Sequence, residues 1–430
     1  MSVEYKRTVC GEGVALTEIF DKKFKSFAVV VRLIAPADAV KTPLYLMAFD
    51  IISMCSRKYP EKEQLTKALV KLYSSSIVSD EQKFSDFESI SLSLNCLADE
   101  YTIGKEKISD KAVDMFLDCL FDPLIENGGF SQKYFELTRK EMLDDISSIV
   151  NSKRRYAAQL AKPYIFKGEG AGINQYDERE AIENATAQSV YEAYKEFLRT
   201  AVFEITVTGA ELGDDQKQKI VERILSIEGR KPVIVNDRRS PSPIKSELCC
   251  KEAEIEARQT QLIIAYKCPE INEDVFKIFA AILGASPLSK LFTNVREKMS
   301  LCYYCDAYPI VTKNTILVTC GLDENDLDKA ITAIDEQINA VRTGDFTDEE
   351  LEYAKKYLID AYLGDYDSKI KLSGWFFGRW IMSSSDSPEE KTDKVRAVSR
   401  EQVIEAAKSF VKDTQFVLKA VTGGVEDNDS

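Results

Sequence analysis

The sequence contains one stretch twice, first as Gly129-Phe130-Ser131-Gln132-Lys133-Tyr134-Phe135-Glu136 with Arg139-Lys140 and Leu143-Asp144. It returns in outline as Asp345-Phe346-Thr347, Leu351-Glu352, Lys355-Lys356 and Ile359-Asp360, and the offset is 346 − 130 = 216. A second match, measured from Val190 to Val403, has the similar offset 403 − 190 = 213. Two matches at nearly one spacing predict two homologous domains of about 210 residues, a period too long for a solenoid.

The predicted boundaries follow from this duplication. We expect an N-terminal domain over residues 1–228, a linker over 229–245 and a C-terminal domain over 246–430. The linker contains Arg238-Arg239-Ser240-Pro241-Ser242-Pro243, which is polar and rich in proline and therefore unlike a core segment.

Both halves mix strand and helix patterns. Apolar residues alternate with serine or asparagine over residues 89–96, which predicts a strand with one buried face. Residues 327–341 keep helical spacing, and Gly344 follows as a C-terminal cap. Thr347 and Glu350 have the spacing of a capping box that opens the next helix. The fold class predicted is α+β, with long helices covering an antiparallel-rich sheet in each domain.

The composition excludes several kinds of chemistry. The 430 residues include no histidine, so a Ser-His-Asp triad, a Cys-His pair and a histidine-ligated zinc centre are all impossible within this chain. The net charge of −14 disfavours nucleic acid or an anionic membrane surface as a partner. The sequence shows neither a span of about 20 apolar residues nor a signal peptide, and we therefore expect a cytoplasmic location.

The ten cysteines are scattered, which suits buried thiols in a reducing compartment. Cys302 and Cys305 form a CxxC pair, but residues 301–308 have the pattern of one extended strand. In a strand these two positions lie on opposite faces and cannot share a metal ion. The adjacent pair Cys249-Cys250 also lacks the spacing of a zinc half-site. We expect no metal and no cofactor.

A family resemblance rests on three features: the duplicated α+β domains, the helix start at Thr42-Pro43 after the strand 27–33, and the segment Ser289–Lys298. Together they resemble the pitrilysin/insulinase family of zinc metallopeptidases, and above all its bacterial two-domain branch. The likeness extends over nearly the whole chain.

The resemblance locates the missing zinc motif. Active members carry H-x-x-E-H on the first long helix, and Met47-Ala48-Phe49-Asp50-Ile51 stands at that place here. Met47 and Ile51 instead belong to an apolar helical stripe that faces a core. The third family ligand, a glutamate, corresponds to Asp145. A hard cation held by Asp50 and Asp145 is one interpretation, and solvated helix charges are the favoured one.

The resemblance also implies one preserved feature. Active enzymes of the family use an arginine and, seven residues later, a tyrosine from the second domain to hold the peptide and the developing oxyanion. Arg296 and Tyr303 have this spacing, since 303 − 296 = 7. They are the predicted substrate-binding residues, with no catalytic residue expected in this chain.

These features lead to a functional hypothesis with an alternative. The chain resembles the metal-free, non-catalytic subunit of a heterodimeric zinc peptidase, in which Arg296 and Tyr303 act at the zinc site of a homologous partner on a peptide or unfolded protein. The alternative is a scaffold or peptide-binding protein without hydrolytic activity, similar to core subunits of respiratory complexes. An independent peptidase with an unusual metal is a third, disfavoured hypothesis, and homodimer formation stays open.

Overall fold

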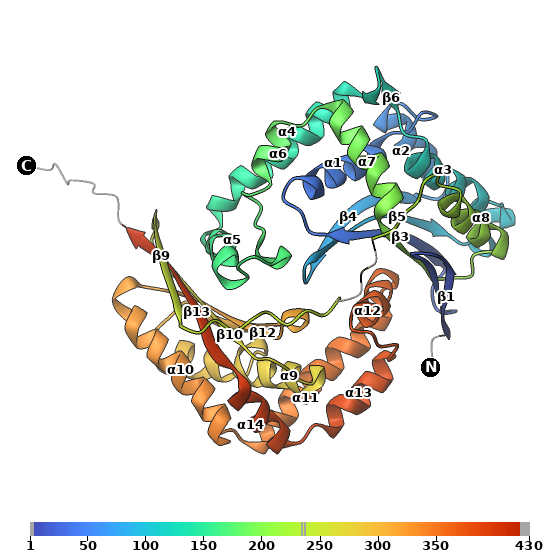
Figure 1. The fold of residues 1–430 in the computed structure, drawn as a ribbon. Coiled ribbons are helices and arrows are strands. Elements are labelled where there is room, and N and C mark those ends of the chain that lie inside the picture. Colours follow the sequence, from blue (N-terminus) through green and yellow to red (C-terminus); the bar gives the residue numbers. More distant parts are fainter. Residues whose placement is uncertain (1–3, 234, 236–237, 422–430) are drawn as a thin grey trace, which may run out of the picture. The chain divides into compact units, whose positions relative to one another are not determined.

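The computed structural model describes residues 4–233, 235 and 238–421. The chain divides into two compact units (Figure 1). Unit 1 comprises residues 1–147, 175–238 and 365–384, and unit 2 comprises 148–174, 239–364 and 385–430. The predicted domain boundaries, which are contiguous in sequence, stay a prediction. In the structure, residues 148–174 of the first half pack in unit 2, and residues 365–384 of the second half pack in unit 1. Residues 234, 236 and 237 of the predicted linker lie outside the described part.

Unit 1 contains a six-stranded sheet with the strand order β1-β2-β8-β3-β5-β4. The β2–β8 pair is parallel and the other pairs are antiparallel. The strands are β1 (Glu4–Gly11), β2 (Val14–Phe20), β3 (Ser26–Pro36), β4 (Ser76–Phe84), β5 (Phe87–Leu97) and β8 (Val202–Gly209); β6 (Ile125–Glu126) and β7 (Gly129–Phe130) form a small hairpin.

The helices of unit 1 lie on both faces of this sheet. Helices α1, α3 and α7 pack on one face, and α12 packs on strands β3 and β8 from the other. The helices are α1 (Lys41–Met54), α2 (Lys62–Val70), α3 (Ser109–Phe121), α4 (Gln132–Ser148), α6 (Arg179–Glu183), α7 (Ala187–Thr200), α8 (Asp214–Leu225) and α12 (Lys369–Ile381).

Unit 2 contains a five-stranded sheet with the order β11-β12-β10-β13-β9. The β13–β9 pair is parallel and the other pairs are antiparallel, so β9-β13-β10-β12-β11 repeats the order and sense of β2-β8-β3-β5-β4. The strands are β9 (Cys249–Glu256), β10 (Thr260–Lys267), β11 (Tyr304–Ile310), β12 (Thr315–Leu322) and β13 (Val411–Val421).

One face of the second sheet carries most of the helices, and α5 covers the other face. The helical elements are α5 (Lys153–Ile165), α9 (Glu273–Ala280), the π-helical turns η5 (Ala281–Ala285) and η6 (Leu291–Lys298), α10 (Leu327–Thr343), α11 (Asp348–Gly364), α13 (Pro388–Ala397) and α14 (Arg400–Ser409). Short 3-10 turns are η1 (Asp99–Tyr101), η2 (Ile103–Lys105), η3 (Ile149–Asn151), η4 (Gly170–Gly172), η7 (Val311–Lys313), η8 (Glu324–Asp326) and η9 (Asp365–Asp367).

Helices α5 and α12 are the exchanged elements. Their start positions differ by 369 − 153 = 216, which equals the first offset found in the sequence. Each helix covers the second face of the sheet built mainly by the other half.

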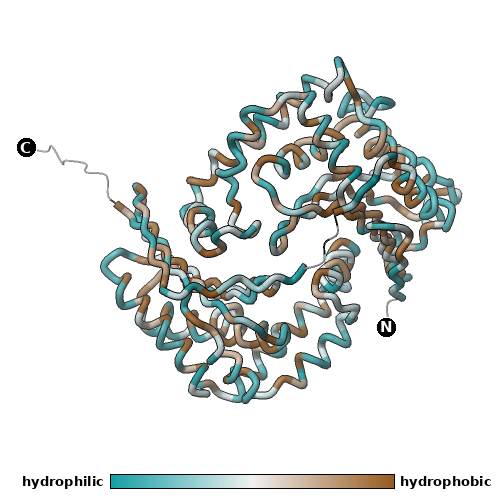
Figure 2. Tube along the Cα trace, viewed as in Figure 1, coloured by the Kyte–Doolittle hydropathy of each residue, from teal (hydrophilic) through white to brown (hydrophobic). Residues whose placement is uncertain are grey.

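The exchange of these helices explains a departure from the predicted strand pattern. The serines of β5 were expected on a solvent face, but Ser89 and Ser91 are only 2% and 6% exposed. Helix α12 covers this end of β5, whereas Asn95 near the other end of the same face stays exposed. The apolar central strands of both sheets can be followed in Figure 2.

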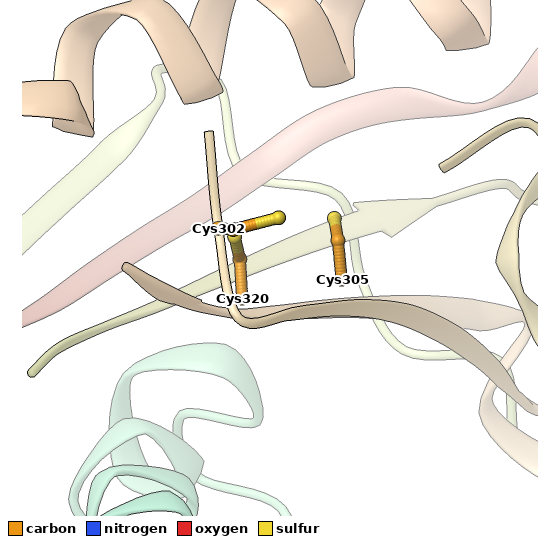
Figure 3. A group of neighbouring side chains, drawn as sticks. All are labelled: Cys302, Cys305 and Cys320. Carbon is orange, nitrogen blue, oxygen red and sulfur yellow. The ribbon is translucent and has the colours of Figure 1, made fainter. Parts of the chain in front are cut away.

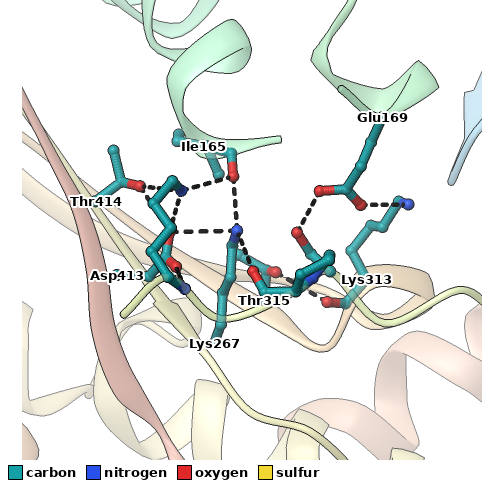
Figure 4. A network of polar contacts seen from close by, with 10 residues as sticks. Ile165, Glu169, Lys267, Lys313, Thr315, Asp413 and Thr414 are labelled. Atoms are coloured by element: carbon teal, nitrogen blue, oxygen red, sulfur yellow. Dashed lines mark hydrogen bonds and ion pairs between the residues drawn. The ribbon is translucent and has the colours of Figure 1, made fainter. Parts of the chain in front are cut away.

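The docking of α5 in unit 2 uses buried charges as well as apolar contacts (Figure 4). Lys267 Nζ donates to the Ile165 carbonyl at the end of α5, over 2.6 Å, and lies 3.2 Å from Asp413 Oδ1. Lys245 Nζ reaches the same carboxylate over 2.6 Å. The last carbonyl groups of a helix lack partners within it, and the Ile165 carbonyl accepts hydrogen bonds from both Lys267 and Lys245.

Local sequence signals confirm several predicted element ends. Helix α10 ends before Gly344, which adopts a left-handed conformation with φ of 79°. The Thr347 hydroxyl accepts from the Glu350 N–H over 3.1 Å, and the Glu350 carboxylate accepts from the Thr347 N–H over 2.6 Å. The predicted α+β fold class is confirmed.

Candidate functional site

The place of the family zinc motif lies on α1 of unit 1, and it is a packed core. Met47 is 0% and Ile51 1% exposed. Tyr45 on the same helix stacks on Phe197 of α7, with ring centroids 4.2 Å apart, and Phe49 packs edge-on against that ring. Helix α1 is therefore buried on more faces than the single stripe predicted, because α7 closes over it.

An acidic pocket of about 390 Å³ lies beside this helix, wholly within unit 1. Its described lining includes six carboxylates and no lysine or arginine: Asp50, Asp80, Glu81, Glu141, Asp145 and Glu178. The structure thus brings Asp50 and Asp145, the two acids singled out by the sequence, to one pocket. The other four acids were missed because no motif or spacing marks them.

Two carboxylates of this pocket, Asp50 and Glu81, hold their protons more tightly than usual. Burial raises the pKa of Asp50, against the hydrogen bond that Ser79 Oγ donates to it over 2.6 Å. Desolvation and the neighbouring Glu88 carboxylate raise the pKa of Glu81 to about 7. Protonated carboxyl groups are poor ligands for a cation.

The residues of this pocket do not fit the zinc ion of the active family members. Zinc needs a compact set of nitrogen, sulfur or carboxylate ligands. Among the described residues, the one group of three or more potential ligands with all ligand atoms within 4.8 Å of one another is formed by cysteines of unit 2. The two histidine positions hold Met47 and Ile51, so the pocket has lost both the ligands and the space for them.

Arg296 and Tyr303 lie together at the surface of unit 2. Arg296 is the sixth residue of η6, and its Nε donates to the Tyr303 carbonyl over 3.0 Å. The guanidinium also lies over the Phe292 ring, 4.7 Å from its centroid. Among the described residues no partner is found for its two terminal nitrogens, so they are available for a planar acceptor such as a peptide carbonyl.

Tyr303 is 53% exposed and occupies the bend that precedes β11. Its N–H donates to the Gly321 carbonyl over 2.8 Å, which holds the bend against β12. Its hydroxyl lies 3.2 Å from Asp323 Oδ1, and this carboxylate raises the pKa of Tyr303. The phenol is therefore protonated at neutral pH and is a hydrogen-bond donor. Asp323 was missed, because strand pairing rather than a local motif brings it to residue 303.

The prediction for the CxxC pair was wrong. The strand begins at Tyr304 and not at Leu301, so Cys302 lies in the preceding irregular segment. A bend frees its side chain from the alternation of the strand. The sulfur atoms of Cys302, Cys305 and Cys320 all lie within 4.8 Å of one another (Figure 3). Cys320 lies on β12 and comes close to the pair through strand pairing, so its distance from Cys302 and Cys305 in the sequence forms no recognisable motif.

Sequence comparison gives two matches. Residues 184–358 match the family model described as "Peptidase M16 inactive domain". The chain is also 21% identical over 406 residues to the Bacillus subtilis (strain 168) protein named "Probable inactive metalloprotease YmfF", covering 94% of this chain and 95% of that protein.

Solved structures with the same fold include a conserved protein from Enterococcus faecalis V583, with a TM-score of 0.89, 22% identity and coverage of 98% of this chain and 99% of that one. A peptidase M16 inactive domain from Pseudomonas fluorescens has a TM-score of 0.77 at 13% identity, with coverage of 99% and 98%. A protease from Helicobacter pylori has a TM-score of 0.78, also at 13% identity, with coverage of 97% and 100%.

The match over residues 184–358 and the similarity to a probable inactive metalloprotease support a likeness to inactive homologues of the pitrilysin/insulinase family, peptidase M16. This confirms the predicted resemblance and agrees with the absence of histidine from the whole sequence. In the described part of the chain no helix is both long and apolar enough to cross a bilayer.

Proposed function

We propose that this chain is the metal-free, non-catalytic subunit of a heterodimeric zinc peptidase. In this role Arg296 and Tyr303 contribute to peptide binding and transition-state stabilisation at the zinc site of a homologous partner. The observation that carries the proposal is the Arg296–Tyr303 arrangement, in which one side chain is fixed through Nε while its terminal nitrogens face no partner among the described residues.

The two residues suit different steps of peptide hydrolysis. A guanidinium anchored at Nε can fork onto a substrate carbonyl with its terminal nitrogens, which aligns the peptide before reaction. A protonated phenol can donate to the oxyanion that develops during attack, and such donors stabilise the transition state more than the ground state. Asp323 holds the Tyr303 hydroxyl in the free chain, so substrate would exchange one acceptor for another.

The test is peptide hydrolysis by the purified complex of this chain with its zinc-motif partner. Tyr303→Phe is expected to lower kcat by about 100-fold, the effect of removing one oxyanion donor. Arg296→Ala is expected to act mainly through KM, since it removes binding that exists before the chemical step. Assembly of the complex should be unchanged, because both side chains are exposed.

Matched controls come from the same chain. Lys298→Ala removes another exposed cation of η6, and Tyr357→Phe removes an exposed phenol of α11; both should leave turnover unchanged. Full activity in the double variant Arg296→Ala, Tyr303→Phe would rule out the proposed role.

A scaffold or peptide-binding protein without hydrolysis is the second candidate. The hydrogen bond between the Tyr303 hydroxyl and Asp323 favours it, since the phenol already has an acceptor. A pull-down from the native cell separates the two. Co-purification of a zinc-motif homologue, with peptidase activity only when both chains are present, supports the first proposal; peptide binding without such a partner supports the second.

A further inference from the structure

The three clustered thiols of unit 2 come from three different backbone positions. Cys305 on β11 and Cys320 on β12 are direct partners in the antiparallel ladder, so their side chains lie on the same face of the sheet. Cys302 reaches them from the bend before β11 (Figure 3). All ten cysteines of the chain are free thiols in this structure, these three included.

The cluster is buried on one side and accessible on the other. Cys305 is 1% and Cys320 0% exposed, whereas Cys302 is half-buried. Two ligands are thus held in a rigid, dry position by strand pairing. The third, Cys302, lies in the irregular segment before β11 and is partly open to solvent, which gives an ion an entry path.

The charges around the cluster favour a thiolate. Hydrogen bonds from Cys305 and Cys320, and then the positive charge of Arg296, lower the pKa of Cys302 to about 4 against the effect of its burial. The hydrogen bonds with Cys302 raise the pKa of Cys305 and Cys320, so without a metal ion one thiolate faces two thiols, and metal binding would release the two remaining protons. The thiolate is the form of cysteine that binds metal ions. Three thiolates around a divalent cation carry a net charge of −1, which the nearby guanidinium balances.

We propose that Cys302, Cys305 and Cys320 form a three-thiolate site for a soft d10 metal ion, Zn²⁺ or Cu⁺, with a further position open beside Cys302. Thiolate sulfur is the ligand that both ions prefer in proteins. A Zn–S bond of about 2.3 Å in tetrahedral geometry places the sulfurs roughly 3.8 Å apart. The sulfurs lie within 4.8 Å of one another, so closing onto an ion needs shifts of at most about 1 Å, within reach of side-chain rotation at Cys302.

Three thiols in mutual reach distinguish this site from a redox pair. A disulfide would use two sulfurs and leave the third without a role, whereas a trigonal or tetrahedral ion uses all three. A bound ion would link β11, β12 and the bend that carries Tyr303. Through the Arg296–Tyr303 hydrogen bond it would also restrain the guanidinium, a consequence that rests on the proposed function, although metal binding itself does not.

The experiment is a metal titration of the reduced, chelator-treated full chain. Cd²⁺ is the first probe, because thiolate-to-cadmium charge transfer gives an ultraviolet band; Zn²⁺ and Cu⁺ follow in competition against chromophoric chelators, which separates the two ions. One equivalent per chain is expected. Cys302→Ser should weaken binding by at least about 100-fold, since even residues that only support metal ligands often cost 10- to 100-fold.

The choice of variants keeps the outcome clear. Cys302 is half-buried, so its serine variant should fold as the parent does, which circular dichroism checks; Cys305→Ala and Cys320→Ala repeat the test at the buried positions. Cys10→Ser and Cys250→Ser, outside the cluster, should bind as the parent does. No cation bound by the reduced chain, or unchanged binding by Cys302→Ser, overturns the proposal. The titration measures no peptidase activity, so its failure is distinct from failure of the proposed function.

Discussion

Helix α1 of unit 1 and the segment from η6 to β11 of unit 2 stand where the family resemblance places metal binding and substrate binding, and their environments are opposite. Met47 and Ile51 on α1 are buried and apolar, whereas Arg296 and Tyr303 are exposed and polar. On α1 the side chains that stand in place of the zinc ligands, Met47 and Ile51, are part of the packed core. Exposed side chains generally contribute little to folding, so we expect that stability alone does not explain why Arg296 and Tyr303 occur together.

The largest expected effect comes from returning a metal ligand to the core. Met47→His should lower the free energy of unfolding of unit 1 by about 3–5 kcal/mol, because it places an imidazole without partners in a packed apolar site. Urea denaturation measures this effect, and added zinc should not reverse it. Met299→His, 46% exposed beyond η6, is the matched control and should change stability by less than about 0.5 kcal/mol. An equal loss of stability in Met47→His and Met299→His would contradict the proposed difference between the buried α1 site and the exposed surface of unit 2.

The acidic pocket predicts a pH dependence confined to unit 1. Glu81 has a pKa of about 7 in the folded chain against an ordinary value of 4.5, so between these values the folded state binds more protons than the unfolded state. Stability should therefore fall as the pH rises from about 5 to 7. Glu81→Gln should flatten this part of the profile of melting temperature against pH. An unchanged slope in the variant would show that Glu81 does not carry the effect.

A smaller effect is expected at Tyr303. Asp323→Asn removes the negative charge beside the phenol, so the pKa of Tyr303 should decrease towards 10.0. NMR titration of ring-labelled tyrosine, with Tyr303→Phe for assignment, measures the shift. Asp306→Asn provides the control, since Asp306 acts on Tyr304 and Tyr308. A change in the pKa of Tyr303 in the Asp306→Asn control would show that Asp323 is not the carboxylate that raises it.

The smallest effect concerns the stability of unit 2. Arg296→Ala and Tyr303→Phe should each change the free energy of unfolding by less than about 0.5 kcal/mol, because exposed side chains contribute little to folding. Chemical denaturation of the isolated chain tests this. A loss of several kcal/mol would show that the pair is structural, and the contrast with α1 would then disappear.

Much of the fold could be predicted because its signals are local or repeated. The cap at Gly344 and the capping box at Thr347 lie within short windows, and the constant offset between the two halves emerges when two windows are compared directly. The missing zinc ligands needed no alignment at all, since the chain contains no histidine.

The failures have a common physical origin. The CxxC prediction failed because a bend at Tyr303 overrides the alternation of a strand, and no nearby residue signals that bend. Ser89 and Ser91 were placed at a solvent face, but helix α12, which lies in the other half of the sequence, covers that face. Alternation of apolar and polar residues predicts which face of a strand is apolar. It does not show that the polar face is exposed, because small polar side chains such as serine can also be buried.

The sequence by itself determined the family resemblance, the duplication and the exclusion of histidine chemistry, because these depend on which residues are present and at what spacing. Only the tertiary structure decided that α5 and α12 are exchanged between the units, that Asp323 meets Tyr303 and that Cys320 joins Cys302 and Cys305. Each of these outcomes depends on pairing between strands or on packing of helices far apart in the chain, where the geometry of the sheet and not the local residue pattern sets the neighbours.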